Sequence, residues 1–222
     1  MDLKRDIFSF WSEMPEDADV HPADERVLAS RKHGFELRGL PGPYAGPLRT
    51  ASVVLLFLSP GLDDRDVAHA ATKAGRRWYV DQRTGKCDLP NEEQHPPAYR
   101  WLNRVIRQFG IDYGKARSTV ATLNIGAYKS VHFTDRPMLS ALPSSKVCLD
   151  WAQSVLFPQA KAGKRVVVCL RSANYWGLRV GESVGSLFCP PCNRGAIMLH
   201  GEMRGRVTSA VHDAVRAAVR SS

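Results

Sequence analysis

Four short apolar runs divide the chain into alternating strand-like and helix-like stretches. The first run, 52–58, is continuously apolar and rich in β-branched residues. This pattern predicts a strand that is covered on both faces, as in the middle of a parallel sheet. Three further runs with strand character lie at 119–123, 165–170 and 186–189.

Helical periodicity fills most of the chain between these runs. Apolar residues recur at intervals of three and four over 64–74, 98–109, 146–157 and 205–219, which predicts amphipathic helices. Strands that alternate with helices indicate right-handed β-α-β crossovers and a mainly parallel sheet with helices on both faces. The stretch 75–97 has mixed charge, three prolines and no clear period, so we expect a long functional loop there.

The first 47 residues precede the alternating strands and helices and have a different pattern. Apolar residues at helical intervals over 2–14 and 22–32 predict two helices, and the prolines and glycines of 41–47 then break any helix. With 222 residues, 44% of them hydrophobic, the chain is expected to fold as one domain spanning 1–222. Residues 1–47 would be its helical and extended N-terminal segment.

Charge points to a polyanionic partner. Lys and Arg number 31 against 22 Asp and Glu, giving a net charge of +9, which favours nucleic acid, although many basic proteins bind none. No run approaches the roughly 18 apolar residues of a membrane-spanning helix, and the N-terminus lacks the pattern of a secretory signal. We therefore expect a soluble, cytoplasmic protein with no membrane partner.

The five cysteines do not form a recognisable framework. They are scattered at 87, 148, 169, 189 and 192, an odd number that favours reduced thiols. Cys189 and Cys192 have metal-ligand spacing, but no second pair supplies the further ligands that zinc needs. We expect no metal and no cofactor.

Polar residues follow each predicted strand, where a parallel sheet places its ligands. These positions are 59–64, 124–130, 171–174 and 192–195, with His200 beyond. They carry amide, glycine and basic groups that suit a nucleobase and phosphates. The chain has no GxGxxG, no GxxxxGK[ST] and no GxSxG, so dinucleotide, phosphate-loop and serine-hydrolase sites lack their motifs.

Three motifs in order carry a family resemblance. LFLSPGL at 56–62 resembles the first motif of the mismatch-specific uracil/thymine DNA glycosylases, in which a strand ends in Asn-Pro-Gly. YRWLNRVIRQFG at 99–110 is similar to the following helix of that family, and ATLN at 121–124 resembles the strand end whose asparagine reads the flipped base. The resemblance covers roughly residues 48–218, with only a loose counterpart of the last motif between Cys189 and His200.

The resemblance implies a three-layer α/β/α sandwich with a central, mainly parallel four-stranded sheet. It also implies a monofunctional DNA glycosylase that binds double-stranded DNA, flips out one nucleotide and hydrolyses its N-glycosyl bond without a cofactor. The resemblance implies a uracil-like base, excised in base-excision repair. Ser59, where the family has Asn or Asp, and the long loop at 75–97 favour a larger modified base, such as a hypermodified cytosine of phage DNA, excised in antiviral defence. Asn124 would read the base; the alternative role for Asn124 is a strand-end turn.

The first motif departs from the family at its catalytic position. Ser59 stands where the family has Asn or Asp, and a hydroxyl without a neighbouring base activates water poorly. Asp63 and Asp64 follow, and a shift of one helical turn would bring either into the site. Their alternative role is to cap the helix that begins near residue 64. Ser59, Asp63 and Asp64 are the catalytic candidates.

Further candidates follow from chemistry and position. Substrate-binding candidates are Pro60, Gly61, Asn124, Tyr128, Trp78, Tyr79, Asn193 and His200, and DNA-binding candidates are Lys129, Arg171, Arg194 and Arg204. Weaker candidates are His132 for the leaving base, Arg76, Arg77 and Arg206 for phosphates, and Met198 or Leu199 as a wedge in the base stack. Core packing and solvated charge are the ordinary alternatives for all of them.

Two other functions compete with the glycosylase. A catalytically silent DNA-binding module on the same fold would also show an altered first motif. A nuclease would use Asp63, Asp64 and a divalent metal, but it would need a further strand-end carboxylate that the sequence does not supply.

Overall fold

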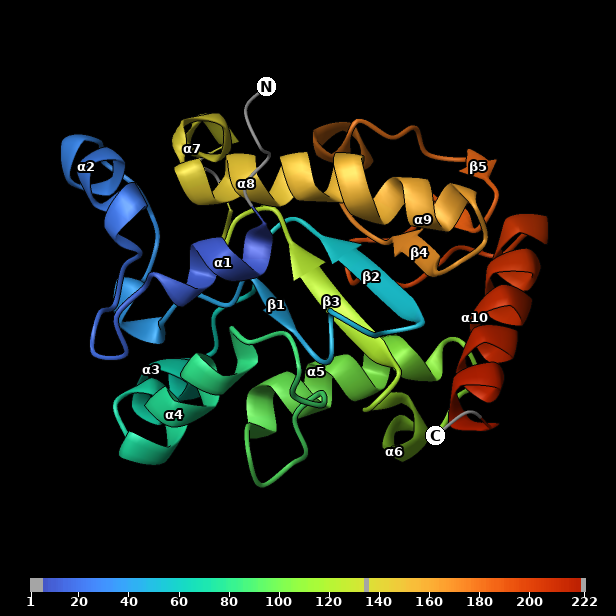
Figure 1. Ribbon diagram of the computed structural model, residues 1–222, viewed down its shortest axis with the longest axis horizontal. Helices are drawn as coiled ribbons and strands as arrows, with labels where there is room; N and C mark the ends of the chain where they lie inside the picture. Colours follow the sequence, from blue (N-terminus) through green and yellow to red (C-terminus); the bar gives the residue numbers. More distant parts are fainter. Residues whose placement is uncertain (1–5, 134–135, 221–222) are drawn as a thin grey trace.

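The computed structural model describes residues 6–133 and 136–220 and shows a mixed β-sheet between helices (Figure 1). Within these residues the sheet has six strands in the order β1-β3-β2-β4-β6-β5. The strands are β1 (Tyr44–Ala45), β2 (Val53–Phe57), β3 (Val120–Asn124), β4 (Val166–Cys169), β5 (Ser183–Val184) and β6 (Leu187–Phe188). The inner strands β3, β2, β4 and β6 are parallel, and the edge strands β1 and β5 are antiparallel to their neighbours.

The helices lie between and around these strands. They are α1 (Ile7–Ser12), α2 (Pro22–Ser30), α3 (Asp64–Ala70), α4 (Lys73–Gln82), α5 (Pro96–Arg107), α6 (Tyr113–Ala116), α7 (Arg136–Ala141), α8 (Pro143–Trp151), α9 (Phe157–Lys161) and α10 (Glu202–Arg220). A π-helical turn, Ala152–Leu156, joins α8 to α9, and 3-10 turns lie at Leu37–Gly39 and Ala173–Trp176.

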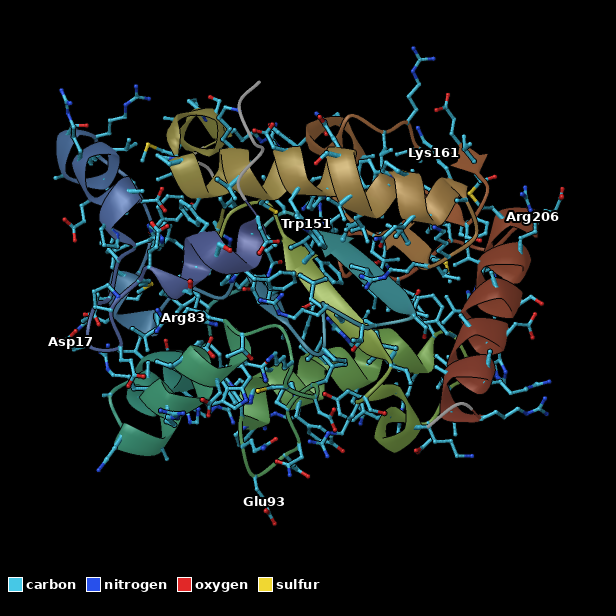
Figure 2. All side chains as sticks on the ribbon, viewed as in Figure 1. Asp17, Arg83, Glu93, Trp151, Lys161 and Arg206 are labelled. Carbon is cyan, nitrogen blue, oxygen red and sulfur yellow. The ribbon has the colours of Figure 1, made fainter. Side chains whose placement is uncertain are left out.

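Alternating side chains of the inner strands build a core on each face of the sheet. Val54 and Leu56 of β2 pack with α1, α8 and α9, whereas Val53, Leu55 and Phe57 pack with α5, α6 and α10. All five side chains are buried, as expected for a strand with both faces covered. The N-terminal segment joins the first core, where Phe8 of α1 lies edge-on to Trp151 of α8 at a ring distance of 5.8 Å. Trp151 lies where α8 meets α1 (Figure 2).

The expected α/β class is confirmed, and the sheet is wider than expected. The predicted strands coincide with β2, β3, β4 and β6 to within about two residues, but the two-residue strands β1 and β5 extend the sheet from four strands to six. Such short strands carry too few residues to show an alternating pattern.

The predicted loop at 75–97 is wrong in its first part, because α4 continues to Gln82. Thr72 caps this helix by accepting a hydrogen bond from the Gly75 N–H at 2.9 Å. The buried positions of the helix are Gly75, Tyr79 and Gln82, so only one large apolar side chain marks the inward face and the helical periodicity is weak. In the described part of the chain, no helix is long and apolar enough to cross a membrane.

Candidate functional site

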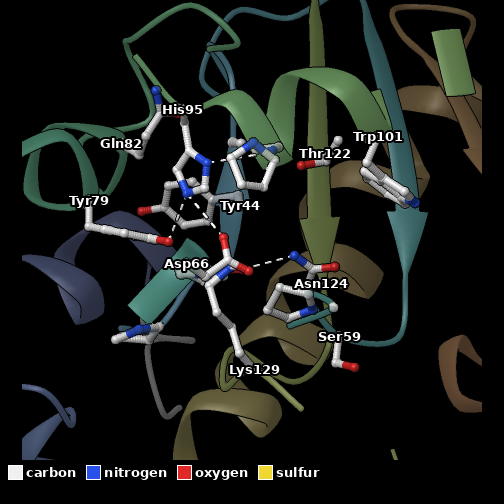
Figure 3. Close-up of a pocket in the computed structure, with 18 of the residues that line it drawn as sticks. Tyr44, Ser59, Asp66, Tyr79, Gln82, His95, Trp101, Thr122, Asn124 and Lys129 are labelled. Carbon is white, nitrogen blue, oxygen red and sulfur yellow. Dashed lines mark hydrogen bonds and ion pairs between the residues drawn. The ribbon is translucent and has the colours of Figure 1, made fainter. Parts of the chain in front are cut away.

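A cavity of about 290 Å³ opens at the carboxyl ends of β2 and β3 (Figure 3). Helices α3, α4 and α5 and the segment 41–45 complete its walls. The side chains that line the cavity include Phe57, Ser59, Asp66, Trp78, Tyr79, His95, Trp101, Asn124 and Lys129. This is the edge of a parallel sheet at which ligands bind.

Asn124, the last residue of β3, is held rigidly in the cavity wall. Its backbone N–H donates to the Pro43 carbonyl at 2.8 Å, and its carbonyl accepts from the Cys148 thiol at 3.1 Å. Its side-chain Nδ2 donates to the Gly42 carbonyl at 2.8 Å. That hydrogen bond fixes which end of the amide is nitrogen, so Oδ1 and the second Nδ2 hydrogen remain for a ligand.

Aromatic rings supply flat apolar surfaces around the cavity. Trp101 on α5 packs edge-on against Phe57 at a ring distance of 4.8 Å. Although its ring touches the core, Trp101 is 37% exposed. A large ring that lies partly in solvent at a cavity is suited to stacking on a nucleobase.

Asp66 is the carboxylate that enters the cavity. It occupies the third position of α3, where its Oδ2 accepts the Asp63 N–H at 2.8 Å in a capping box. The residue is only 4% exposed. Its two oxygens also face His95 Nε2 at 3.4 Å and Lys129 Nζ at 3.5 Å.

His95 is neutral and has a defined tautomer. Burial, reinforced by the positive charge of Lys129, lowers the pKa of His95 to about 3. Its Nδ1 accepts the Ala98 N–H at 3.3 Å, so Nε2 carries the hydrogen. Nε2 lies 2.9 Å from the Tyr79 hydroxyl. Because His95 donates in this pair, the Tyr79 hydroxyl hydrogen is left to bind a ligand.

Lys129 contributes a buried ammonium group to the same wall. The residue is 7% exposed, and burial lowers its pKa while the carboxylate of Asp66 opposes that shift. Its Nζ also lies 5.7 Å from the centre of the Tyr79 ring. The expected contact of Lys129 with DNA phosphates on the surface is therefore wrong, since the side chain points into the protein.

Several sequence-predicted residues meet at this cavity. They are Ser59, Pro60, Gly61, Asp63, Trp78, Tyr79, Asn124 and Lys129. Asp63 lines the rim but is engaged elsewhere: its carboxylate accepts the Arg65 N–H at 3.0 Å and pairs with the Arg65 guanidinium at 2.9 Å. That hydrogen-bonded pair lowers the pKa of Asp63. Asp63 thus has the capping role, and Asp64 is exposed outside the cavity.

Tyr128 does not reach the cavity and belongs to the core. It is 1% exposed, and its hydroxyl donates to the buried Asp24 carboxylate at 2.8 Å and accepts the His21 N–H at 3.2 Å. The substrate-binding role predicted for Tyr128 is wrong because its one polar atom is already used. Met198 is likewise 1% exposed and has no surface to wedge into DNA.

The remaining predicted residues lie outside the cavity lining. Asn193 organises its own loop, since its Oδ1 accepts the N–H groups of Gly195 and Ile197 at 2.8 and 3.1 Å. His200 and Arg204 border a shallow groove at the start of α10, and the Arg171 guanidinium donates to the Arg194 carbonyl.

The weaker candidates also lie outside the cavity lining. Leu199 and His132 are exposed. Arg76 pairs with Asp19 at 2.7 Å, Arg77 pairs with Asp81 at 2.9 Å, and Arg206 donates to the Ser183 hydroxyl at 3.1 Å.

Asp66, His95 and Trp101 are site residues that sequence reasoning missed. The spacing Asp-x-x-Asp at 63–66 is that of a capping box and marks Asp66 as an ordered carboxylate. His95 directly precedes the two prolines that start α5, a position that predicts a helix cap. Nothing in the sequence shows that either side chain is buried at a cavity.

The part of the chain that the structure describes holds no group of three or more His, Cys, Asp or Glu side chains that could bind a metal ion. All five cysteines are free thiols. No protein-family model, curated protein or solved structure matches this chain.

Proposed function

We propose that this protein is a hydrolytic DNA glycosylase of the uracil-DNA glycosylase type, acting on one extruded base. The observation that carries the proposal is the fixed amide of Asn124 at an aromatic-walled cavity. One amide hydrogen is committed to the Gly42 carbonyl, while the opposite end of the amide is left for the hydrogen-bonding edge of a base. An extruded base is recognised by hydrogen bonds to its edge and by stacking on aromatic side chains, and this amide and these rings can supply both.

The architecture supports the same proposal. The inner strands β3, β2, β4 and β6 are parallel, and helices pack on both faces of them. The Ser59-Pro60-Gly61 turn follows β2 and lies next to the segment that follows β3, where Gly61 bridges Ser130. The two motifs that resemble the glycosylase family therefore border one cavity.

Asp66 supplies the carboxylate that the altered first motif lacks. Cleavage of an N-glycosyl bond leaves positive charge on the sugar, and water must then attack that carbon. A buried carboxylate beside the Ser59 turn stabilises this charge and orients water, while the Ser59 hydroxyl offers a second contact. Asp66 thus replaces Asp63 and Asp64 as our catalytic candidate.

The leaving base needs hydrogen-bond donors, and the cavity offers neutral ones. Burial raises the pKa of Tyr79, so its hydroxyl stays protonated. Because His95 donates to that hydroxyl, the Tyr79 hydrogen points away from His95. The free Nδ2 hydrogen of Asn124 is a second donor. Fixed donors in a dry site stabilise negative charge as it develops.

The test is release of free base from DNA in the presence of a chelator. Genomic DNAs that carry uracil, ordinary bases or modified cytosines are incubated with the protein, and the released bases are identified by mass. We expect one base to be released by the wild type and by Asn174→Ala, which removes an exposed asparagine outside the cavity. Asn124→Ala should lose this activity.

The alternative is a silent DNA-binding module, which the serine at position 59 favours. Salt-sensitive DNA binding without release of any base by the wild type would support that module and overturn the glycosylase. Equal release by the wild type and Asn124→Ala would overturn the base-reading role of Asn124.

A further inference from the structure

Lys129 is built into the cavity wall by contacts along its whole length. Its carbonyl accepts the Glu36 N–H at 2.9 Å, and the next residue, Ser130, forms a parallel bridge with Gly61. Its aliphatic stem passes over Gly39, where an added Cβ would come within 2.9 Å of Lys129 Cδ. The backbone and stem are therefore fixed, and the amine is held at Asp66.

A structural role explains this lysine poorly. Taking an ammonium group out of water costs several kcal/mol. The attraction of a single carboxylate rarely exceeds this cost, so the ion pair adds little to stability. Among the described residues, Asp66 is the carboxylate with an oxygen within 4.0 Å of Lys129 Nζ, at 3.5 Å. Burial lowers the pKa of Lys129, which raises the fraction of free amine, the form that attacks carbonyl carbons.

The position of the Lys129 amine relative to the Ser59-Pro60-Gly61 turn and Asn124 indicates which part of a bound nucleotide it would contact. If Asn124 reads the base, the Ser59-Pro60-Gly61 turn faces the sugar, as the family resemblance implies. Lys129 adjoins that turn through the bridge between Gly61 and Ser130, and it lines the same cavity as Ser59 and Asn124. The amine therefore lies in the same cavity as the residues to which the proposed function assigns the base and the sugar.

We propose that Lys129 is a nucleophile that forms an imine with the aldehyde carbon of an abasic deoxyribose, a step that rests on the proposed glycosylase function for its supply of substrate. The substrate class is a DNA strand carrying an abasic site. This inference adds a covalent, strand-cleaving step to simple hydrolysis of the N-glycosyl bond.

The step balances without an oxidant or a cofactor. The lone pair of Nζ forms a bond to the aldehyde carbon, and the carbonyl oxygen leaves as water after taking up two protons, with Asp66 as the nearby proton carrier. Loss of a proton from the neighbouring sugar carbon to Asp66 then lets the 3′ phosphate depart with the electron pair of its carbon–oxygen bond. Water finally hydrolyses the imine and returns the free amine.

The experiment uses DNA with a preformed abasic site, so that it does not depend on base release. Sodium borohydride is added to the full-length protein and this DNA, because reduction of an imine leaves a stable covalent bond. We expect a cross-linked band on a denaturing gel and a mass adduct on the peptide that contains Lys129. Lys86→Arg, which changes an exposed lysine outside the cavity, should cross-link like the wild type.

Lys129→Arg keeps the positive charge opposite Asp66 but removes the nucleophilic amine. Loss of the cross-link in this variant, with an unchanged melting temperature, would support the proposal. If the variant fails to fold, the position of the mass adduct in the wild type decides. An adduct on another residue, or no cross-link with the wild type, would overturn the nucleophilic role of Lys129.

The two proposals fail separately. Base release by the wild type without any cross-link to abasic DNA would overturn the imine and leave the glycosylase intact. A cross-link at Lys129 without release of any base would support the imine and overturn the glycosylase.

Discussion

The backbone N–H of Asp63 donates to the side chain of Asp66 at 2.8 Å, at the first turn of α3. This hydrogen bond separates the roles of two carboxylates that the sequence presents together. Asp63 faces the Arg65 guanidinium at 2.9 Å, whereas Asp66 is turned inward to His95 and Lys129. A single helical turn therefore places one carboxylate at the rim and the other inside the cavity.

Replacing Asp66 by Asn should reduce base release by about 100- to 10,000-fold, the range typical of a lost acid or base. The amide oxygen of Asn can still accept the Asp63 N–H, so the start of α3 is expected to stay folded. Single-turnover rates of base release measure the effect.

Asp64→Asn is the matched control for this change, because Asp64 belongs to the same helical turn and is exposed outside the cavity. It should keep the wild-type rate. The assignment of Asp66 fails if the two variants slow base release equally while both remain folded.

Replacing Trp101 by Ala should weaken binding of DNA by about 1 to 3 kcal/mol, the contribution of one aromatic ring stacked on a base. Trp101→Phe should recover most of this loss, because a smaller flat ring remains beside Phe57. Fluorescence anisotropy with labelled DNA measures the affinity. Val180→Ala removes another exposed apolar side chain outside the cavity lining and should leave the affinity unchanged, and a similar loss in both variants would argue against stacking.

His95 should make the free energy of unfolding depend on pH. Its pKa is 6.5 in the ordinary state and about 3 in the folded protein, so below pH 6.5 the unfolded chain binds the proton first. Stability is therefore fully present above pH 6.5 and is lost as pH falls toward 3. The loss attributable to His95 between pH 7 and pH 5 is about 2 kcal/mol.

Urea unfolding at these two pH values tests this dependence. His95→Gln retains a donor for Tyr79 but does not titrate, so its stability should fall less between pH 7 and pH 5 than that of the wild type. An equal fall in both proteins would show that His95 is not the group responsible.

Replacing Tyr128 by Phe should lower the free energy of unfolding by about 1 to 3 kcal/mol, because it leaves the buried Asp24 carboxylate without its hydroxyl donor. Base release by the folded variant should match the wild type, since Tyr128 lies outside the cavity. Thermal melting and the single-turnover rate are measured together. A large loss in the rate of base release, with an unchanged free energy of unfolding, would show that Tyr128 takes part in the functional site.

The sheet could be predicted from the sequence because its strands are buried on both faces. The run 52–58 is short, apolar after its first residue and rich in β-branched residues, a combination that favours a buried strand over a helix. The part of the cavity at the strand ends was predicted for a related reason, because lining residues such as Ser59 and Asn124 lie at the carboxyl ends of strands.

The polar interior of the cavity could not be predicted in this way. Asp66, His95 and Lys129 are buried polar residues, and their types are those of exposed positions in most proteins. Their burial depends on contacts between α3, the start of α5 and the end of β3, which are distant in sequence. The same limit hid α4, whose inward positions include Gly75 and Gln82.

The proposed glycosylase activity is tested most directly with a DNA duplex that carries one target base at a known position. The protein is incubated with it in chelator, the free base is identified by mass, and the DNA is then treated with alkali. We expect release of that base and one break at its position, made by the wild type and Asp64→Asn but not by Asn124→Ala. DNA that is bound in a salt-sensitive way but stays intact, with no base released, would contradict it.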